Sequence, residues 1–238
     1  HMVREEQLRL LKGLINHLDN KTNVNAGGIL KTPADTYISE DRFEREWNSF
    51  FLNHPQIIGL SGDLPKPNTY LTTEDFGSPV LAVRNDSGEF KAYANVCSHR
   101  GVTVESGERG EKTKFSCPFH GWTFDNEGKL VGYPKKEQFG DIDKDCYGLK
   151  ELPAIEKFGF LWVHPCTDGV INLDDLLGEK LLTEFDSWDF QSLVFANEEK
   201  YETEMNWKLA IDTFGETYHF SVLHKDSLFE SFHGNCQL

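Results

Sequence analysis

Two short stretches of this sequence each pair one cysteine with one histidine. Cys97 and His99 are separated by one residue, whereas Cys117 and His120 are separated by two. Two thiolates can hold one iron of a [2Fe–2S] cluster while two imidazoles hold the other. Neutral imidazoles in place of two thiolates raise the reduction potential of such a centre, to roughly −150 to +300 mV. These four side chains are therefore predicted to be the ligands of a [2Fe–2S] cluster.

Two other chemistries are open to the same residues. Two cysteines and two histidines can hold a structural zinc ion, although zinc modules usually place two to four residues between the first two ligands. A catalytic Cys/His pair is the other alternative, but it requires no duplicated motif. Gly101 and Gly121, which follow the two motifs, leave room for backbone N–H groups to approach the sulfurs.

A second group of residues near the end of the sequence could bind a metal. Glu216 and His219 are three residues apart and would share one face of a helix, and His224 follows five residues later. Because a spacing of five turns two side chains away from each other, a helix must end or distort near 220–223 for both histidines to reach one metal. The alternative is that these are ordinary surface or core side chains.

Helices are expected at both ends of the chain. Residues 5–18 carry apolar side chains at spacings of three and four, which predicts an amphipathic helix. Ser39 can cap a second helix that runs through Phe50 towards Pro55. A third helix is expected over residues 206–219, after a mixed α/β stretch that begins beyond residue 165.

The middle of the chain reads as a small antiparallel β sandwich or barrel. Turn signals at 85–88 and 125–128 separate short β-rich runs. The expected strands are 57–60, 69–72, 80–84, 90–94, 114–117, 122–125 and 160–163. Because each Cys/His motif follows or ends one of these strands, the four candidate ligands are expected on two neighbouring loops.

Charge and cysteine content exclude several classes of protein. The net charge of −15 disfavours binding to nucleic acid or to an anionic membrane surface. Five cysteines do not form a disulfide framework, so Cys146, Cys166 and Cys236 are expected to be free thiols. No apolar run is long enough to span a bilayer and no signal peptide is evident, so we expect a cytoplasmic protein.

The Cys-x-His and Cys-x-x-His-Gly-Trp motifs resemble those of the Rieske family. The respiratory branch of that family adds a disulfide between the two loops, but its cysteines would stand at Val102 and Phe119. The resemblance therefore implies the oxygenase or soluble ferredoxin branch. It also implies an α+β chain with an N-terminal helical segment (3–45), an all-β Rieske domain (46–165) and the first part of an α+β catalytic domain (166–238).

The later residues resemble a Rieske non-haem iron oxygenase α subunit of the aromatic-ring-hydroxylating type. This resemblance rests on Asn206-Trp207-Lys208 and on the acidic-x-x-His-x-x-x-x-His segment at 216–224. It implies that His219 and His224 bind a mononuclear Fe(II), and that Glu216 is the acidic bridge for electron transfer. The third ligand in the family is a downstream Asp, which we expect beyond Leu238; Asp226 and Glu230 do not match its position.

The resemblance also implies partners and a reaction. A ferredoxin or flavin reductase would supply electrons, and a small organic substrate would undergo hydroxylation or demethylation with O₂, by a dioxygenase or monooxygenase reaction. The full-length subunit would form a homotrimer in which electrons cross between subunits. The alternative functions are a Rieske electron-transfer protein without oxygenase activity and a zinc-stabilised binding module. The sequence does not reveal the substrate.

Overall fold

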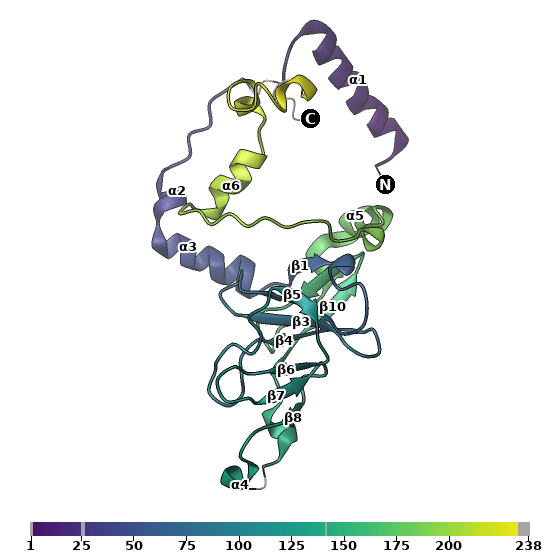
Figure 1. Ribbon diagram of the computed structural model, residues 1–238. Coiled ribbons are helices and arrows are strands. Elements are labelled where there is room, and N and C mark those ends of the chain that lie inside the picture. The colour runs from purple at the N-terminus through teal and green to yellow at the C-terminus, as the bar shows by residue number, and fades with distance from the viewer. Residues whose placement is uncertain (1, 25–26, 141, 233–238) are drawn as a thin grey trace. The chain divides into compact units, whose positions relative to one another are not determined.

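The computed structural model describes residues 2–24, 27–140 and 142–232. The chain divides into two compact units, one drawn from residues 1–44 and 198–238 and the other from residues 45–197 (Figure 1). The three-domain division expected from the sequence stays a prediction.

Helices and helical turns occupy both units. The α-helices are α1 (Arg4–Asn20), α2 (Asp35–Ile38), α3 (Glu40–Glu46), α4 (Lys136–Phe139), α5 (Leu173–Ser187) and α6 (Trp207–Phe214). A π-helical turn, η1 (Trp47–Leu52), follows α3. The 3₁₀ turns are η2 (Ser61–Asp63), η3 (Lys144–Tyr147), η4 (Phe190–Ser192), η5 (Tyr218–Ser221) and η6 (Phe229–Ser231).

The first two helix predictions are confirmed with small changes. Helix α1 extends the predicted helix by one residue at its start and two at its end. The Ser39 hydroxyl accepts a hydrogen bond from the Arg42 N–H at 3.3 Å, as expected of a capping residue. The helix that it caps changes to π-helical geometry at Trp47 instead of continuing as α-helix.

The predicted helix over 206–219 is wrong in its second half. Helix α6 ends at Phe214, and the N–H of Gly215 donates to the carbonyls of both Ile211 and Asp212. Such a shared hydrogen bond is common where a helix terminates, and glycine is a poor residue for continuing one. Glu216 and His219 therefore lie in the turns after the helix and share no helix face.

Eleven strands of the described residues form three antiparallel sheets. The strands are β1 (Gln56–Leu60), β2 (Thr69–Thr73), β3 (Val80–Arg84), β4 (Phe90–Ala94), β5 (Arg109–Glu111), β6 (Lys114–Ser116), β7 (Thr123–Asp125), β8 (Leu130–Gly132), β9 (Glu151–Leu152), β10 (Ala154–Lys157) and β11 (Phe160–Val163). Their orders are β1-β11-β10, β5-β2-β3-β4-β9 and β6-β7-β8. The α+β class and the antiparallel β domain expected from the sequence are confirmed.

The seven predicted strands are all present, and four short ones were missed. Both predicted turns close hairpins, with φ of 83° at Gly88 and 73° at Gly128. The missed strands have two to four residues and lack a long apolar pattern. Strand β6 ends one residue before Cys117 and β7 begins one residue after Trp122, so both residues belong to the connecting loop.

The β strands of the second unit enclose two buried groups of side chains. One contains Leu71, Val80, Leu161 and Val163 and joins the five-stranded sheet β5-β2-β3-β4-β9 to β11. The other contains Tyr93, Phe115, Phe124 and both candidate ligand cysteines. In Figure 1, the β6-β7-β8 sheet and α4 lie towards one end of this unit. The candidate ligands are therefore mounted on a packed β framework.

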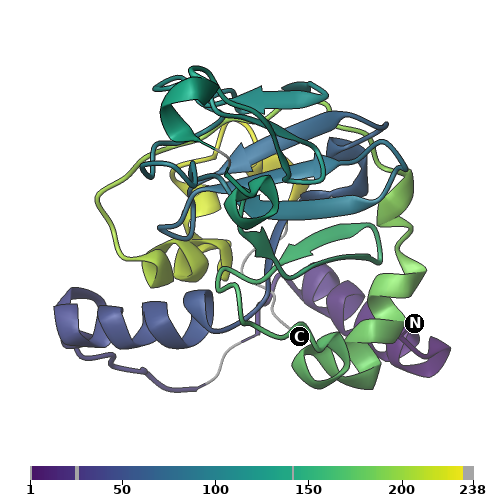
Figure 2. The same cartoon turned by 90° about the horizontal axis from the view of Figure 1, so that it is seen from below.

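The mixed α/β stretch expected after residue 165 has no strand among described residues 166–232. Helix α5 occupies its first part, and the Asn172 side chain caps it by accepting the Asp175 N–H. Phe185 contacts the Phe160 ring and Leu177 packs against the buried cluster that contains Phe160, and Figure 2 shows the helix alongside the strands. This helix covers the β1-β11-β10 sheet.

Candidate metal centres

The loop that carries Cys97 and His99 is a tight turn closed by backbone hydrogen bonds. The N–H of Cys97 donates to the carbonyl of Val102 at 2.8 Å, and the N–H of Gly101 donates to the carbonyl of Cys97 at 2.9 Å. Gly101 has a φ of 72°, a left-handed conformation that glycine adopts without strain. This geometry turns the chain back on itself immediately after the His99 side chain.

The second loop repeats the same construction. The N–H of Cys117 donates to the carbonyl of Trp122 at 2.8 Å, and the N–H of Gly121 donates to the carbonyl of Cys117 at 2.9 Å. Gly121 has a φ of 69°. In both loops a cysteine starts the turn and a glycine four residues later ends it. The N–H groups of these glycines therefore bond to the cysteine carbonyls.

A buried asparagine fixes the chain on either side of the first loop. Asn95, 1% exposed, accepts the N–H groups of Val104 and Glu105 at 3.2 and 3.0 Å through its side-chain oxygen. Its amide nitrogen donates to the carbonyl of Glu105 at 2.7 Å. Because one side chain satisfies three buried backbone groups, the two arms of the loop are held at a fixed separation. Sequence analysis missed this residue, since an isolated asparagine carries no motif.

The two candidate ligand cysteines lie next to each other in the core. Cys97 and Cys117 are each 3% exposed, and their side chains are within hydrogen-bonding distance. Burial raises the pKa of the Cys97 thiol, and the Cys117 thiol adds to that effect. The backbone N–H groups of His99 and Arg100 act in the opposite direction, since they hydrogen-bond to the Cys97 sulfur. Backbone donors thus already face the sulfur that would carry negative charge as a ligand.

The two candidate ligand histidines also form a pair. The ring centroids of His99 and His120 are 4.7 Å apart, with an angle of 70° between the rings. The Nδ1 atom of His99 is buried and has no hydrogen-bond partner among the described residues. Burial lowers the pKa of His99, and repulsion from His120 and Arg100 lowers it further. A neutral imidazole with an unpartnered buried nitrogen is suited to bind a metal.

The two pairs of side chains, thiols on one side and imidazoles on the other, fit the ligand set of a two-iron cluster. A tetrahedral zinc site needs four ligands around one point. A [2Fe–2S] cluster of this ligand set needs two thiolates on one iron and two imidazoles on the other. The donor set and the orphaned His99 nitrogen therefore fit the cluster predicted from the sequence.

A hollow of about 510 Å³ adjoins the paired histidines. Arg100 and Lys135 supply positive charge at its surface, and Phe119 is 57% exposed beside His120. The full lining consists of His99, Arg100, Phe119, His120, Trp122, Pro134, Lys135, Gln138 and Phe139. The histidine side of the candidate centre is thus accessible, whereas the cysteine side is enclosed.

The second group predicted from the sequence lies in the other unit. The carboxylate of Glu216 hydrogen-bonds to Nδ1 of His219 at 2.5 Å and also accepts the backbone N–H of His219 at 3.2 Å. The hydrogen bond to the His219 side chain lowers the pKa of Glu216. This contact leaves Nε2 of His219 as the nitrogen that can face a metal.

His224 lies near His219, but no third candidate ligand among residues 2–232 that the structure describes converges with them. Their ring centroids are 5.4 Å apart, and the Phe220 ring packs on both, at 4.8 Å from His219 and 5.5 Å from His224. The helix ends before this point, as the spacing of five residues required, although it does so at Phe214 and not near residues 220–223. The described residues therefore supply two imidazoles and one orienting carboxylate.

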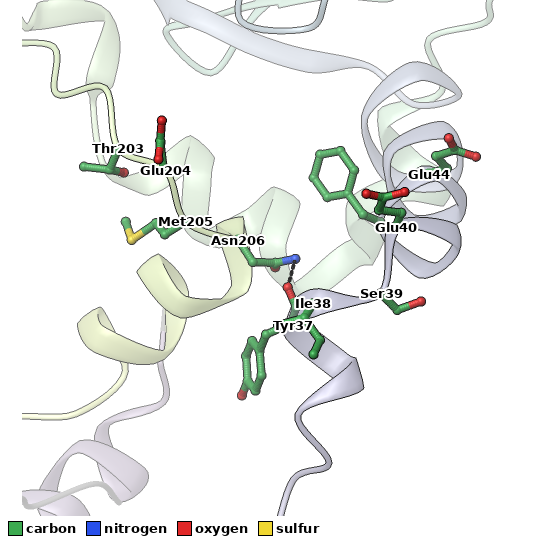
Figure 3. Close-up of a pocket in the computed structure, with 10 residues that line it drawn as sticks. Tyr37, Ile38, Ser39, Glu40, Glu44, Thr203, Glu204, Met205 and Asn206 are labelled. Atoms are coloured by element: carbon green, nitrogen blue, oxygen red, sulfur yellow. Dashed lines mark hydrogen bonds between the residues drawn. The ribbon is translucent and has the colours of Figure 1, made fainter.

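Helix α6, which precedes this group, is anchored to the N-terminal segment. The side chain of Asn206 caps the helix by accepting the Lys208 N–H, and its amide nitrogen donates to the carbonyl of Tyr37 at 3.1 Å. The Tyr37 hydroxyl donates to Asp212 at 2.7 Å. Figure 3 shows Asn206 and Tyr37 beside a hollow of about 750 Å³. Sequence analysis missed Tyr37, because no local pattern connects residues 175 positions apart.

The remaining cysteines have no partner motif. Cys146 is exposed and Cys166 is half-buried, and both are free thiols as predicted. Cys236 lies outside the described residues. None of the helices that the structure describes combines the length and apolar character that crossing a membrane requires.

Comparison with known proteins connects both groups of residues to one family. Residues 54–155 match the Rieske [2Fe-2S] domain, and residues 190–237 match the catalytic domain of the ring-hydroxylating alpha subunit. The toluate 1,2-dioxygenase alpha subunit of Pseudomonas putida is 31% identical over 83% of this chain and 45% of its own length. The glycine betaine monooxygenase oxygenase subunit of Chromohalobacter salexigens is 30% identical over 82% of this chain and 43% of its own length.

Solved structures give the same result. The quaternary ammonium Rieske monooxygenase CntA superposes with a TM-score of 0.71 at 26% identity, covering 82% of this chain and 55% of its own. A naphthalene 1,2-dioxygenase superposes with a TM-score of 0.68 at 27% identity, covering 79% of this chain and 43% of its own. The first of these proteins is named a Rieske monooxygenase and the second a dioxygenase.

The chain belongs to the family of Rieske non-haem iron oxygenase alpha subunits. It is a family of oxidoreductases, in which the Rieske domain has a [2Fe–2S] cluster and the catalytic domain a mononuclear iron. The chain spans about half the length of the curated relatives that it matches.

Proposed function

We propose that this chain transfers electrons within a Rieske oxygenase, from a [2Fe–2S] cluster towards a mononuclear iron that reacts with O₂ and a small organic substrate. The proposed cluster ligands are Cys97, His99, Cys117 and His120, and the proposed iron ligands are His219 and His224. One observation carries the proposal: two loops of identical hydrogen bonding bring a pair of buried thiols and a pair of imidazoles together.

The protein groups around the proposed cluster have distinct roles. When bound, the cluster would store one electron at a time, and the mononuclear iron would supply the site for O₂ activation. The buried cysteines are shielded from water, while the His99 and His120 side faces an accessible hollow. Electrons would therefore leave on the histidine side. This asymmetry supports docking of an electron acceptor there.

Glu216 is the proposed acceptor residue for that electron path. Its carboxylate holds His219 through Nδ1, which fixes the ring orientation and raises its basicity as a ligand. In the proposed homotrimer, the second oxygen of Glu216 would approach a cluster histidine of a neighbouring subunit. The contact between Glu216 and His219 favours an oxygenase over a pure electron-transfer protein, which has no use for a carboxylate-oriented second histidine pair.

The family supports a general class of substrate and of electron donor for this chain, and no single compound or protein. Its named members act on toluate, naphthalene, anthranilate and glycine betaine, so the proposed reaction is hydroxylation or demethylation of a small organic molecule. A ferredoxin or flavin reductase is the proposed electron donor. The unpaired cysteines support a cytoplasmic location.

Anaerobic purification with iron and sulfide tests the proposal. The protein should be red-brown, contain about two irons and two sulfides per chain from the cluster, and give a Rieske-type EPR signal on reduction. A colourless protein that binds one zinc ion instead would overturn it. Substrate-coupled O₂ consumption by the protein together with the downstream region of its relatives separates an oxygenase from an electron-transfer protein.

A further inference from the structure

We propose that Trp122 is a positioning residue of the iron–sulfur centre, whose indole ring sets the orientation of the His99 imidazole while its backbone carbonyl holds Cys117. This inference rests on the proposed cluster. It assigns one residue the task of linking the two loops, because Trp122 belongs to the second loop and His99 to the first.

The contact between the two rings is a parallel stack. The ring centroids of Trp122 and His99 are 4.8 Å apart and the angle between the rings is 5°. Trp122 is 2% exposed, so its ring has little room to move. A flat wall against one face of an imidazole restricts rotation about its terminal side-chain bond, which is otherwise broad. The stack therefore determines where the buried Nδ1 of His99 points.

The indole is itself held by other aromatic rings. Tyr133, Phe139 and Tyr147 contact it at centroid distances of 5.8, 5.9 and 5.6 Å. The carbonyl of Tyr147 also accepts a hydrogen bond from the hydroxyl of Ser98, the residue before His99, at 2.7 Å. The aromatic rings that surround Trp122 are thus connected to the first loop as well as to the second.

The backbone of Trp122 completes the link. Its carbonyl accepts the N–H of Cys117 at 2.8 Å, which closes the second loop. A shift of Trp122 would therefore be transmitted to a proposed ligand of each iron, through the carbonyl to Cys117 and through the ring to His99.

The indole N–H has no hydrogen-bond partner among the described residues. Replacement by phenylalanine therefore keeps an aromatic face and breaks no hydrogen bond within the described protein. Replacement by methionine keeps an apolar, adaptable side chain but removes the flat face. The pair of variants Trp122→Phe and Trp122→Met separates a role of the ring from a role of simple core filling.

The reduction potential is a readout that simple core filling does not move. The reduced cluster carries one more negative charge than the oxidised cluster, and water near the ligands stabilises that charge. Loss of the flat indole face would let the His99 imidazole turn towards water, and this change of orientation would raise the midpoint potential. A less restrained imidazole would also change the nitrogen hyperfine couplings seen by pulsed EPR.

The experiment compares these variants with a matched control in the purified, cluster-loaded protein. Trp162 is 3% exposed in the same unit, but it lies on β11 and packs with Phe160 and Leu173. Trp122→Met should raise the midpoint potential, alter the histidine couplings and lose iron several-fold faster to a chelator. Trp122→Phe should stay close to the native protein in all three. Trp162→Met should lower the thermal midpoint but leave potential and couplings unchanged.

Three results would overturn the inference. One is a native potential with native couplings in Trp122→Met, and another is an equal shift of potential in Trp162→Met. The third is loss of the cluster from Trp122→Phe as well as from Trp122→Met, because a flat ring would then not suffice. Failure of the proposed function is a separate outcome, since the native protein would then contain no iron–sulfur cluster.

Discussion

The carboxylate of Glu216 contacts His219 twice, through the imidazole Nδ1 at 2.5 Å and through the backbone N–H at 3.2 Å. Glu216 lies between α6 and η5, and His219 belongs to the 3₁₀ turn η5. The side-chain contact therefore adds to the backbone hydrogen bonds of this turn in orienting His219. A carboxylate in this position also selects the imidazole tautomer that presents Nε2 to a metal.

Replacement of Glu216 by glutamine should slow electron transfer without loss of metal. The amide oxygen can still accept from Nδ1–H, but the charge that raises the basicity of His219 is removed. We expect single-turnover electron transfer to fall by about 10- to 100-fold in the protein together with the downstream region of its relatives. Stopped-flow oxidation of the cluster by O₂ measures this rate.

Glu230→Gln is the control for that experiment, because Glu230 is an exposed carboxylate of the same segment. Its rate should equal that of the native protein. An unimpaired rate in Glu216→Gln would reject the bridging role.

Replacement of Cys117 by serine should abolish the cluster. Cys117 is buried against Cys97, and a serine hydroxyl is a poor ligand for iron compared with a thiolate. We expect iron content to fall from about two per chain to near zero, with loss of the visible absorption. Cys146→Ser is the matched control, since Cys146 is exposed and belongs to neither loop. Retention of native colour by Cys117→Ser would contradict the ligand assignment.

The sequence predicted those strands and turns that depend on neighbouring residues along the chain. Strand β11 is buried along its whole length and β3 at every residue except Arg84, and both appear in the sequence as apolar runs. The glycine turns at 88 and 128 are evident from composition. The extent of α6 was wrong because the periodicity of its apolar residues continues past Gly215, where the backbone hydrogen bonds stop.

The candidate ligands could be found from the sequence, but their supports could not. A Cys/His spacing is visible in one dimension, whereas the contacts of Asn95 with Val104 and of Trp122 with His99 join different loops. Such residues look like ordinary polar or aromatic core positions until the loops are placed side by side. Their chemistry depends on tertiary contacts that no local pattern records.

Replacement of Asn95 by alanine should destabilise the first loop and release iron. The change leaves two backbone N–H groups and one carbonyl without their partner, which costs about 3 kcal/mol in unfolding free energy. We expect faster loss of iron to a chelator below the unfolding transition, because the loop opens locally before the whole unit unfolds.

Asn85→Ala separates this local effect from general instability. Asn85 is equally buried at 1% exposed and accepts the Glu89 N–H, but it lies in the hairpin at the other end of β4 from Cys97. Asn85→Ala should lower the urea midpoint about as much as Asn95→Ala does. The rate at which a chelator removes iron from the folded Asn85→Ala protein should equal that of the native protein. Equal chelation rates in the two variants would show that Asn95 has no particular effect on the loop.

Glu105, whose backbone Asn95 holds, should make the stability of this unit depend on pH. Burial alone would raise the pKa of its carboxyl, but the hydrogen bonds from Lys112 and from the Gly107 N–H outweigh burial and hold the pKa below its ordinary value. A carboxyl with a lowered pKa in the folded state stabilises the fold above its unfolded pKa, about 4.3 for glutamate, and this contribution is lost as pH falls through the folded value.

Glu105→Gln should therefore cost about 2 kcal/mol at neutral pH, and the deficit relative to the native protein should shrink below about pH 4.3. Urea unfolding at a series of pH values measures it. Glu111→Gln is the control, because Glu111 pairs with Lys66 at the surface, where such pairs contribute little. Glutamine resembles a protonated glutamate much more closely than an ionised one. If the variant's loss of unfolding free energy stayed constant from pH 7 to pH 3, the effect of Glu105 would therefore be one of packing and not of charge.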